Sequence, residues 1–448
     1  MTLDPNPNSP ALGALTYLAP PACVGVLGGG QLGRMLVQAA QSMGYNTAVL
    51  DPDPSCPASG VAEHFLCCDY TQEDGLKALS LLATRVTTEF ENVPAQTLER
   101  LAHGLGVSPS GASVRVAQDR VLEKTSIQRS GLPVAPFCVI ETQDDLALAP
   151  QELFPGILKT ARLGYDGKGQ VVVNTAQDLP AAYAQLQASQ RTPALTCVLE
   201  KKLPLWAECS VILARTPTGH CVHLPIQINQ HHHGILFSST VFPGWVEPSL
   251  EEELQHAAQT LAQSIDYVGV LCVEFFVLEG TKTSATSGHQ DSPFHWVVNE
   301  MAPRPHNSGH HSLNSCSTSQ FELQLRVLVG LPLTPVIQHS HCVSLNLLGD
   351  LWLDPSPIRG QESPEPIEPD WSRVLALPGT HLHLYGKHEA RRARKMGHLN
   401  ITGHTPQDVQ STVTLCLALL GLDGLGLGVS DPLLKAGKPL LVNALSPT

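Results

Sequence analysis

The sequence contains no apolar stretch long enough to cross a bilayer, which excludes a helical membrane-spanning protein. Residues 1–21 contain neither Lys nor Arg, so the chain lacks the charged start of a secretory signal peptide. Pro and Asn are frequent in this stretch, and we expect it to form a disordered extension. These absences predict a cytoplasmic protein that has no membrane partner.

The chain also lacks an excess of basic residues. Its 27 Lys and Arg against 40 Asp and Glu give a formal charge of −13, which does not favour nucleic-acid binding. An anionic ligand must therefore meet a local basic cluster. The twelve cysteines include no C-x-x-C pair and no repeated spacing, so we expect reduced thiols rather than a disulfide framework.

A length of 448 residues exceeds one ordinary hydrophobic core and predicts two to four domains. Residues 23–51 have the pattern of a strand, a glycine turn, an amphipathic helix and a second strand, which predicts a βαβ start for a first domain over 22–115. A polar helix over 119–130 then begins a second domain over 116–330, and a last domain follows over 331–448. Further strands are expected at 85–90, 134–140, 156–160, 171–173, 198–200 and 208–214, an exposed loop at 279–293, and a helix near 407–420.

Two apolar runs carry one carboxylate each: residues 270–277 contain Glu274, and residues 297–300 end in Glu300. A lone Glu inside a buried strand is costly unless something compensates its charge. A shared divalent cation would compensate both carboxylates, and Mg²⁺ carried on nucleotide phosphates suits oxygen ligands. The alternative is that each Glu faces solvent or pairs with Arg304.

Residues 28–33 match G-x-G-x-x-G between the first predicted strand and the first predicted helix. Asp51 lies about 20 residues further on, where a dinucleotide fold places the acid that binds ribose. The pattern is typical of an NAD site. It also fits another phosphate ligand at the helix start, or a tight turn without any ligand.

A second glycine-rich segment, residues 164–169, follows the strand lysine Lys159. Glycines let backbone N–H groups face phosphate oxygens and lysines supply point charge, so this arrangement suits a polyphosphate. The Walker A pattern is absent, and a hairpin turn is the alternative. Glu200 and Glu208 flank residues 201–206. A carboxylate eight residues beyond a strand end could accept from ribose hydroxyls; a solvated strand end is the alternative.

Arg304 opens a segment rich in histidine, residues 304–310, just after Glu300. Zinc is disfavoured here and at the histidines 231–233, because no cysteine lies at finger spacing and the nearby carboxylates prefer a harder ion. Lys387 and residues 391–395 form the one strong basic patch. Such a patch suits a phosphomonoester; a solvated loop is the alternative, and the short run and negative net charge disfavour nucleic acid.

Seven segments in order resemble the ATP-grasp superfamily and, within it, the N5-carboxyaminoimidazole ribonucleotide synthases. They are residues 28–36, 89–93, 164–170, 299–304, 306–310, 319–322 and 394–398. The resemblance implies an α/β and α+β architecture with an N-terminal Rossmann-like pre-ATP-grasp domain. A central ATP-grasp domain of two subdomains and a small β-rich C-terminal domain complete it.

The resemblance also implies residue roles, with Mg²⁺, or Mn²⁺ in its place, held by Glu274 and Glu300. ATP would contact Arg120, Lys159, Gly164, Tyr165, Asp166, Gly167, Lys168, Gly169, Gln170, Glu200, Lys201, Lys202, Leu203, Glu208, His231, Asn299 and Glu300. The ribonucleotide substrate would contact Glu91 (or Glu89), Tyr165, Asp166, Lys168, Lys387, Arg394 and Lys395. The implied catalytic residues are Arg304, His306, Asn307, His310 and Lys168.

The implied reaction is ATP-dependent carboxylation of 5-aminoimidazole ribonucleotide by bicarbonate, through carboxyphosphate, in purine synthesis. A homodimer that passes its product to a mutase is expected. The alternatives are a formate-dependent glycinamide ribonucleotide transformylase, an NAD-dependent oxidoreductase and a non-catalytic nucleotide sensor. The loop at 279–293 looks longer than the family needs, and Asn314-Ser315 stands where Glu-Ala is expected.

Overall fold

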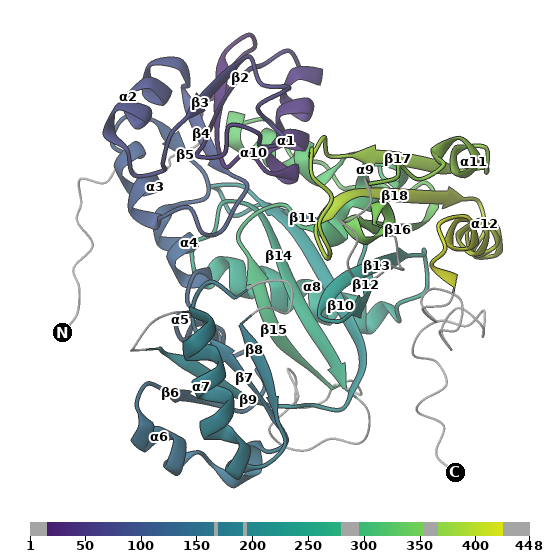
Figure 1. Cartoon of the computed structure of the whole chain (residues 1–448). Helices are drawn as coiled ribbons and strands as arrows, with labels where there is room; N and C mark the ends of the chain where they lie inside the picture. Colours follow the sequence, from purple (N-terminus) through teal and green to yellow (C-terminus); the bar gives the residue numbers. More distant parts are fainter. Residues whose placement is uncertain (1–15, 165–168, 191–194, 279–294, 354–365, 424–448) are drawn as a thin grey trace.

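The computed structural model describes residues 16–164, 169–190, 195–278, 295–353 and 366–423 (Figure 1). These residues form three sheets, with helices packed on their faces. The predicted loop at 279–293 lies outside the described residues, as does most of the predicted extension. The described end of that extension is held in place, since the Leu18 amide donates to the Val329 carbonyl at 2.9 Å. No helix in the described part of the chain has the length and apolar character for a bilayer crossing.

The N-terminal sheet is parallel, with strand order β3-β2-β1-β4-β5. Its strands are β1 (Cys23–Leu27), β2 (Asn46–Asp51), β3 (His64–Cys67), β4 (Arg85–Thr88) and β5 (Gly106–Val107), and its helices are α1 (Gln31–Ser42), α2 (Glu73–Leu82), α3 (Ala95–Leu101) and α4 (Gly111–Ala117). The predicted βαβ start is confirmed. Strand order reverses between β1 and β4, and ligands of open α/β sheets bind beyond the carboxyl ends of strands at such a point.

The second sheet is antiparallel, in the order β6-β9-β7-β8, and lies at the bottom of Figure 1. It consists of β6 (Phe137–Ile140), β7 (Gly156–Thr160), β8 (Gln170–Val173) and β9 (Cys197–Lys201), with α5 (Arg120–Arg129), α6 (Gln143–Leu148), α7 (Leu179–Gln190), η1 (Gln151–Leu153) and η2 (Ala176–Asp178). Asp119 begins α5 because its carboxylate accepts from the amides of Val121 and Leu122. The apolar sides of α7 and the strands form a separate small core.

The third sheet is antiparallel and follows the order β15-β14-β10-β12-β13-β16-β18-β17, with β11 added beside β10. Its strands are β10 (Leu205–Arg215), β11 (Cys221–His223), β12 (Gln227–His232), β13 (Ile235–Val241), β14 (Gly269–Leu278), β15 (Trp296–Ala302), β16 (His341–Leu348), β17 (Thr380–Leu384) and β18 (Lys395–Gly403). The accompanying helices are α8 (Pro248–Ser264), η3 (Asn307–His311), α9 (Ser312–Ser315), α10 (Gln320–Val329), η4 (Gly349–Trp352), α11 (Trp371–Leu375) and α12 (Pro406–Leu419).

One apolar cluster runs through this third sheet. It joins α8 and β14 with β16, β18 and α12, so residues on both sides of the predicted boundary at 330 share a core. β13 pairs directly with β16, because Ser238–Val241 and Cys342–Leu345 are in register. The C-terminal strands therefore extend the central sheet.

Candidate active site

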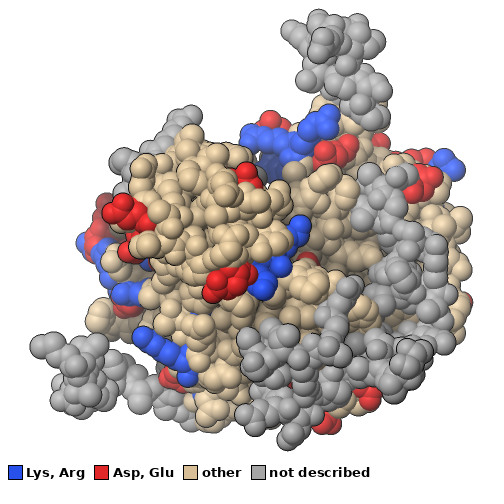
Figure 2. Space-filling view, turned by 90° about the horizontal axis from the view of Figure 1, so that it is seen from below, with Lys and Arg blue, Asp and Glu red and all other residues tan. Residues whose placement is uncertain are grey.

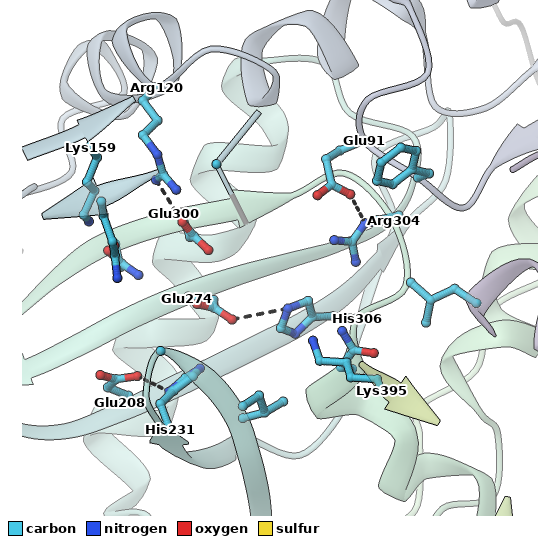
Figure 3. A pocket seen from close by; sticks show the side chains of 18 of the residues that line it. Glu91, Arg120, Lys159, Glu208, His231, Glu274, Glu300, Arg304, His306 and Lys395 are labelled. Carbon is cyan, nitrogen blue, oxygen red and sulfur yellow. Dashed lines mark hydrogen bonds and ion pairs between the residues drawn. The ribbon is translucent and has the colours of Figure 1, made fainter. Parts of the chain in front are cut away.

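A cavity of about 860 Å³ is lined by residues from all three sheets (Figure 3). The N-terminal sheet contributes Asp51 and the segment after its strand β4 contributes Glu91, the small sheet contributes Lys159, and the large sheet contributes Glu274 and Lys395. Figure 3 shows these side chains arranged around one space and attached to separate elements. Most of the polar residues singled out from the sequence therefore meet in one place.

The two strand carboxylates lie opposite each other. Glu274 of β14 is the register partner of Glu300 of β15, and a bulge follows this pair. Glu300 accepts from Arg120 at 2.9 Å, and Glu274 lies 3.4 Å from His306 Nε2. Burial and the neighbouring Glu300 raise the pKa of Glu274 to about 8, because two like charges at one buried place disfavour ionisation. The alternative in which Arg304 pairs with these carboxylates is wrong.

Arg304 instead pairs with Glu91, which follows β4 of the N-terminal sheet. The Arg304 guanidinium holds the pKa of Glu91 below its usual value against the opposing effect of burial. His306, two residues on, has its Nδ1 2.9 Å from the Ser308 hydroxyl. Burial and the nearby positive charges of Arg304 and Lys395 lower the pKa of His306 well below its usual value, so the imidazole is neutral.

Three cations surround the buried carboxylate of Glu200, at the end of the cavity formed by the small sheet. Lys124 Nζ and Lys159 Nζ each lie 3.1 Å from Glu200 Oε2, and Arg120 is close by. Despite burial, these cations lower the pKa of Glu200 to about 2. Sequence reasoning missed Lys124. Its spacing of four from Arg120 on a helix is the signal that indicates a shared face.

The wall beside these cations is apolar on one side and acidic on the other. Glu208 of β10 lies 2.5 Å from His231 Nδ1 of β12 and raises the pKa of that histidine against the effect of burial. Apolar lining comes from residues on four strands and two connecting segments. These residues are Ala135, Ile157, Leu203, Leu205, Leu236 and Phe276.

The glycine turn that resembles a dinucleotide motif already has an anionic partner. The Glu89 carboxylate accepts from the amides of Gly30 and Gly33, each at 3.0 Å. The Asp51 carboxylate accepts from Gly29 N at 2.6 Å and from the Tyr70 hydroxyl at 2.9 Å. Because these carboxylates occupy the amides, a pyrophosphate at this turn would meet repulsion. The turn binds its own acids and gives no support to an NAD site.

The predicted basic cluster divides into two parts. Lys387, Arg394 and Lys395 line the cavity, whereas Arg391 pairs with Glu389 on the surface. Lys387 Nζ donates to the Lys395 carbonyl at 2.7 Å, which ties the loop to β18. On the face shown in Figure 2, the described Lys and Arg side chains lie in small groups beside Asp and Glu. This mixture does not form a broad basic surface among the described residues of that face.

His310 lies behind the cavity rather than on its described lining. Its buried ring stacks on His398, with ring centroids 4.3 Å apart, and His398 stacks on His383 at 4.5 Å. Asn314, which stands where Glu is expected, lies 2.9 Å from His383 Nε2 and accepts from Asn400. The predicted catalytic role of His310 stays a prediction.

The remaining predicted ATP contacts fall in three groups: residues that line the cavity, Gly169, and residues outside the described part of the chain. Gly164, Gln170, Lys201, Lys202 and Asn299 line the cavity, together with Asn307 from the predicted catalytic set. Gly169 has a φ of +73° at the start of β8, and a Cβ there would approach the Thr160 hydroxyl to 2.6 Å. Tyr165, Asp166, Gly167 and Lys168 lie outside the described residues.

Three family models match the chain in order. Residues 22–118 match the ribonucleotide synthetase preATP-grasp domain, and residues 125–321 match the ATP-grasp domain. Residues 342–412 match the phosphoribosylaminoimidazole carboxylase C-terminal domain. Fold and cavity together define an ATP-grasp enzyme, a class that uses ATP, and the predicted fold class is confirmed.

Individual relatives indicate the family within the ATP-grasp class. The N5-carboxyaminoimidazole ribonucleotide synthase of Brucella melitensis is 39% identical over 389 residues, which cover 86% of this chain and 97% of the relative. The chain therefore belongs to the N5-carboxyaminoimidazole ribonucleotide synthase family, as predicted. It is a ligase of purine biosynthesis, and the oxidoreductase and transformylase alternatives are not supported.

Two solved structures carry ligands that bear on the cavity. A Staphylococcus aureus N5-carboxyaminoimidazole synthetase complexed with ADP has a TM-score of 0.77 and 33% identity, covering 90% of this chain and 98% of that chain. An Aspergillus clavatus N5-carboxyaminoimidazole synthase binds ADP and 5-aminoimidazole ribonucleotide. It has a TM-score of 0.74 and 26% identity, covering 89% of this chain and 98% of that chain.

Proposed function

We propose that this chain uses ATP to carboxylate 5-aminoimidazole ribonucleotide with bicarbonate, giving N5-carboxyaminoimidazole ribonucleotide, ADP and phosphate. One observation supports this assignment above the others. The paired carboxylates Glu274 and Glu300 lie in one cavity between two cationic ends, with Lys159 at one end and Arg394 and Lys395 at the other. A triphosphate and a phosphomonoester each require such an end.

We place ATP at the end formed by the small sheet. Arg120 and Lys159 are the proposed phosphate ligands, and Glu208 beside His231 is the proposed ribose acceptor. The apolar wall next to Leu203 suits adenine, whose ring edge would be read by the chain from Glu200 to Leu203. Bound phosphates would compete with Glu200 for Lys159, which now lies 3.1 Å from that carboxylate.

The donor set between the two ends fits Mg²⁺. Glu274 and Glu300 present carboxylate oxygens, and the buried Asn299 Oδ1 makes no hydrogen bond in the described structure. Hard divalent cations prefer such oxygens, and a bound cation would relieve the repulsion that raises the Glu274 pKa. When bound, Mg²⁺ would neutralise charge that develops on the transferred phosphoryl group. Mn²⁺ has similar ligand preferences.

The ribonucleotide phosphate is assigned to Lys387, Arg394 and Lys395, and its aminoimidazole to Glu91 together with Tyr165, Asp166 and Lys168. Glu91 is the better assignment than Glu89, because both Glu89 oxygens already accept from glycine amides. Gly164 and Gln170, on either side of residues 165–169, line this cavity. As the family resemblance implies, we propose that the segment 164–170 excludes water from the reaction.

The chemistry proceeds in two transfers. A bicarbonate oxygen attacks the γ-phosphorus of ATP, ADP leaves, and carboxyphosphate results. The substrate amine then attacks the carboxyl carbon, the phosphate leaves, and the departing phosphate takes the amine proton. Arg304 is suited to stabilise the carboxyl oxygens because Glu91 orients its guanidinium. The neutral imidazole of His306 and the amide of Asn307 are suited to orient bicarbonate by hydrogen bonds.

Omission assays test the proposed reaction. We expect ADP release to need both bicarbonate and 5-aminoimidazole ribonucleotide, and to fall to background when either is left out. Release that follows formate and glycinamide ribonucleotide instead would assign the chain to a different ATP-grasp reaction. ATP binding without substrate-dependent ADP release would leave only a nucleotide sensor.

Assembly and partners follow as further proposals. We infer a homodimer in the cytoplasm whose product is used by an N5-carboxyaminoimidazole ribonucleotide mutase. Sedimentation of the whole chain tests the dimer, and a monomer at assay concentration would contradict it.

A further inference from the structure

A thiol, a carboxylate and an imidazole converge beside the cavity. The ligand atoms of Cys272, Glu274 and His306 all lie within 4.8 Å of one another. Cys272 and Glu274 are two residues apart in β14, which places both side chains on the same face of the strand. His306 reaches them from the segment that follows β15. Figure 3 shows the Glu274 carboxylate directed at the His306 ring.

The separation of the carboxylate and the imidazole suits a four-coordinate cation. Zinc binds nitrogen and carboxylate oxygen at about 2.0–2.2 Å, so two such ligands in a tetrahedron lie about 3.3–3.5 Å apart. Glu274 Oε1 and His306 Nε2 are 3.4 Å apart. The thiol sulfur supplies the soft third ligand. Glu274 and His306 also line the cavity, which leaves a fourth position open toward it.

The far side of the imidazole is already held. The Ser308 hydroxyl lies 2.9 Å from His306 Nδ1 and donates to Gln227 Oε1 at 3.4 Å, and the Ser308 amide donates to the same Nδ1 at 3.4 Å. Histidines that bind metals through one nitrogen commonly donate the other N–H to such a partner, which fixes the ring and its tautomer. Binding through Nε2 would move the ring proton to Nδ1, beside the Ser308 hydroxyl and in place of the contact with the Ser308 amide, and would release the protons of the Cys272 thiol and the Glu274 carboxyl to solvent.

We propose that Cys272, Glu274 and His306 form a site for a thiophilic divalent cation of the zinc class. This site is distinct from the oxygen site of Glu274 and Glu300, but the two share Glu274. A zinc-class ion and Mg²⁺ therefore exclude each other, and micromolar zinc inhibits ADP release. Binding stands on the geometry alone, whereas the inhibition rests on the proposed function.

Cobalt spectroscopy tests the binding without any assay of activity. Co²⁺ is titrated into the reduced whole chain, without Mg²⁺ or nucleotide, and the sulfur-to-cobalt charge-transfer absorption is followed. We expect the band to saturate in the wild type, to disappear on Zn²⁺ addition and to be absent from Cys272→Ala. Cys272→Ser removes the thiolate with little change of volume and replaces Cys272→Ala if that variant does not fold.

Two other cysteines provide matched controls. Cys209→Ala removes a buried thiol from the adjacent strand β10, and Cys67→Ser removes an exposed one. Both should keep the band. A wild type without the band, a band that survives in the Cys272 variants, or loss in Cys209→Ala or Cys67→Ser would each overturn the site.

Inhibition provides a second arm. Cys272→Ala should keep ordinary ADP release in Mg²⁺ but weaken inhibition by Zn²⁺ about tenfold or more. Equal inhibition of both proteins would overturn the competition with Mg²⁺. If neither protein releases ADP while the cobalt band behaves as expected, the proposed function fails and the metal site stands.

Discussion

At the scale of single residues, the cavity is governed by which charge each side chain meets. Glu200 meets three cations and stays ionised, whereas Glu274 meets another carboxylate and a neutral imidazole. The pKa of a glutamate is therefore lowered at one position of this cavity and raised at another. This contrast supports the proposal that Glu274 and Glu300 share a cation from outside the chain.

Glu300→Gln should reduce ADP and phosphate release about 100-fold or more, because it removes one of two charged oxygen ligands and leaves an amide. The fold should persist, since glutamine has nearly the same shape. Phosphate release measures the first effect and circular dichroism the second. Glu322→Gln on α10, outside the cavity lining, is the matched control. Near-normal release by Glu300→Gln would remove this residue from the metal site.

Stability without ligand should depend on pH through Glu274. Its folded-state pKa is raised to about 8, so between the ordinary carboxylate range and that value the folded chain holds a proton that the unfolded chain has lost. The stability contributed by this proton is therefore lost as pH rises through about 8. Between pH 6 and pH 9, a range around the expected titration, the melting temperature of the wild type should fall more than that of Glu274→Gln. Parallel melting curves for the two proteins would contradict the shifted pKa.

Arg394→Ala should raise the KM for 5-aminoimidazole ribonucleotide about tenfold or more, because charge-assisted hydrogen bonds to phosphate are strong. The KM for ATP should change little. Arg391→Ala is the control, since Arg391 belongs to the same run but pairs with Glu389 at the surface. Initial rates at varied ribonucleotide give both values, and an unchanged ribonucleotide KM would exclude Arg394 from the phosphate site.

At the scale of elements, two features decide how the cavity is built. The bulge after Glu274 and Glu300 keeps the apolar partners Phe275 and Val298 in register on the core side. Glu89, which directly follows β4, accepts from the amides of the glycine turn between β1 and α1. These hydrogen bonds join the segment after β4 to the segment after β1. The helix start therefore has its anion supplied from within the fold.

Glu89→Ala should destabilise the N-terminal sheet by about 1–3 kcal/mol, because it leaves two amides without acceptors. Glu89→Gln keeps one acceptor oxygen and should be milder. Urea unfolding followed by circular dichroism compares the variants. If Glu89→Ala unfolds at the wild-type urea concentration, the carboxylate does not support the turn. Addition of the wild-type chain should leave NADH fluorescence unchanged, because the carboxylates already occupy the amides of this turn.

At the scale of the whole molecule, the central and C-terminal parts share one sheet and one core. β16 covers the edge of β13, and apolar residues of β18 and α12 pack in the same cluster as α8. The N-terminal sheet, the small sheet and this large sheet each supply one wall of the cavity. Activity therefore needs all three to be present.

A chain that ends at residue 338 should fail to reach the native fold, because it exposes the β13 edge and removes part of the main core. Circular dichroism and the melting-temperature shift with ATP measure the loss. A chain that ends at residue 423 keeps every described element and serves as the control. A cooperative, ATP-stabilised melt of the shorter chain would show that the central part folds alone.

Sequence pattern by itself determined the local elements, and the resemblance to a known family indicated most of the cavity's residues. Periodicity predicted β1, α1 and β2, because apolar residues at helical or strand spacing must bury one face. Carboxylates in apolar strands pointed to Glu274 and Glu300 for a similar reason, since a buried charge requires compensation. Both arguments involve residues close together in the chain.

Tertiary structure alone decided which distant residues became partners. Glu89 accepts a hydrogen bond from the glycine turn, Lys124 pairs with Glu200, and Cys272 lies close to His306. Periodicity and spacing describe neighbours along a chain, whereas these pairings depend on the crossing of sheets that hold residues far apart in sequence. Charge and coordination act over a few ångströms of space, so only the folded chain assigns them.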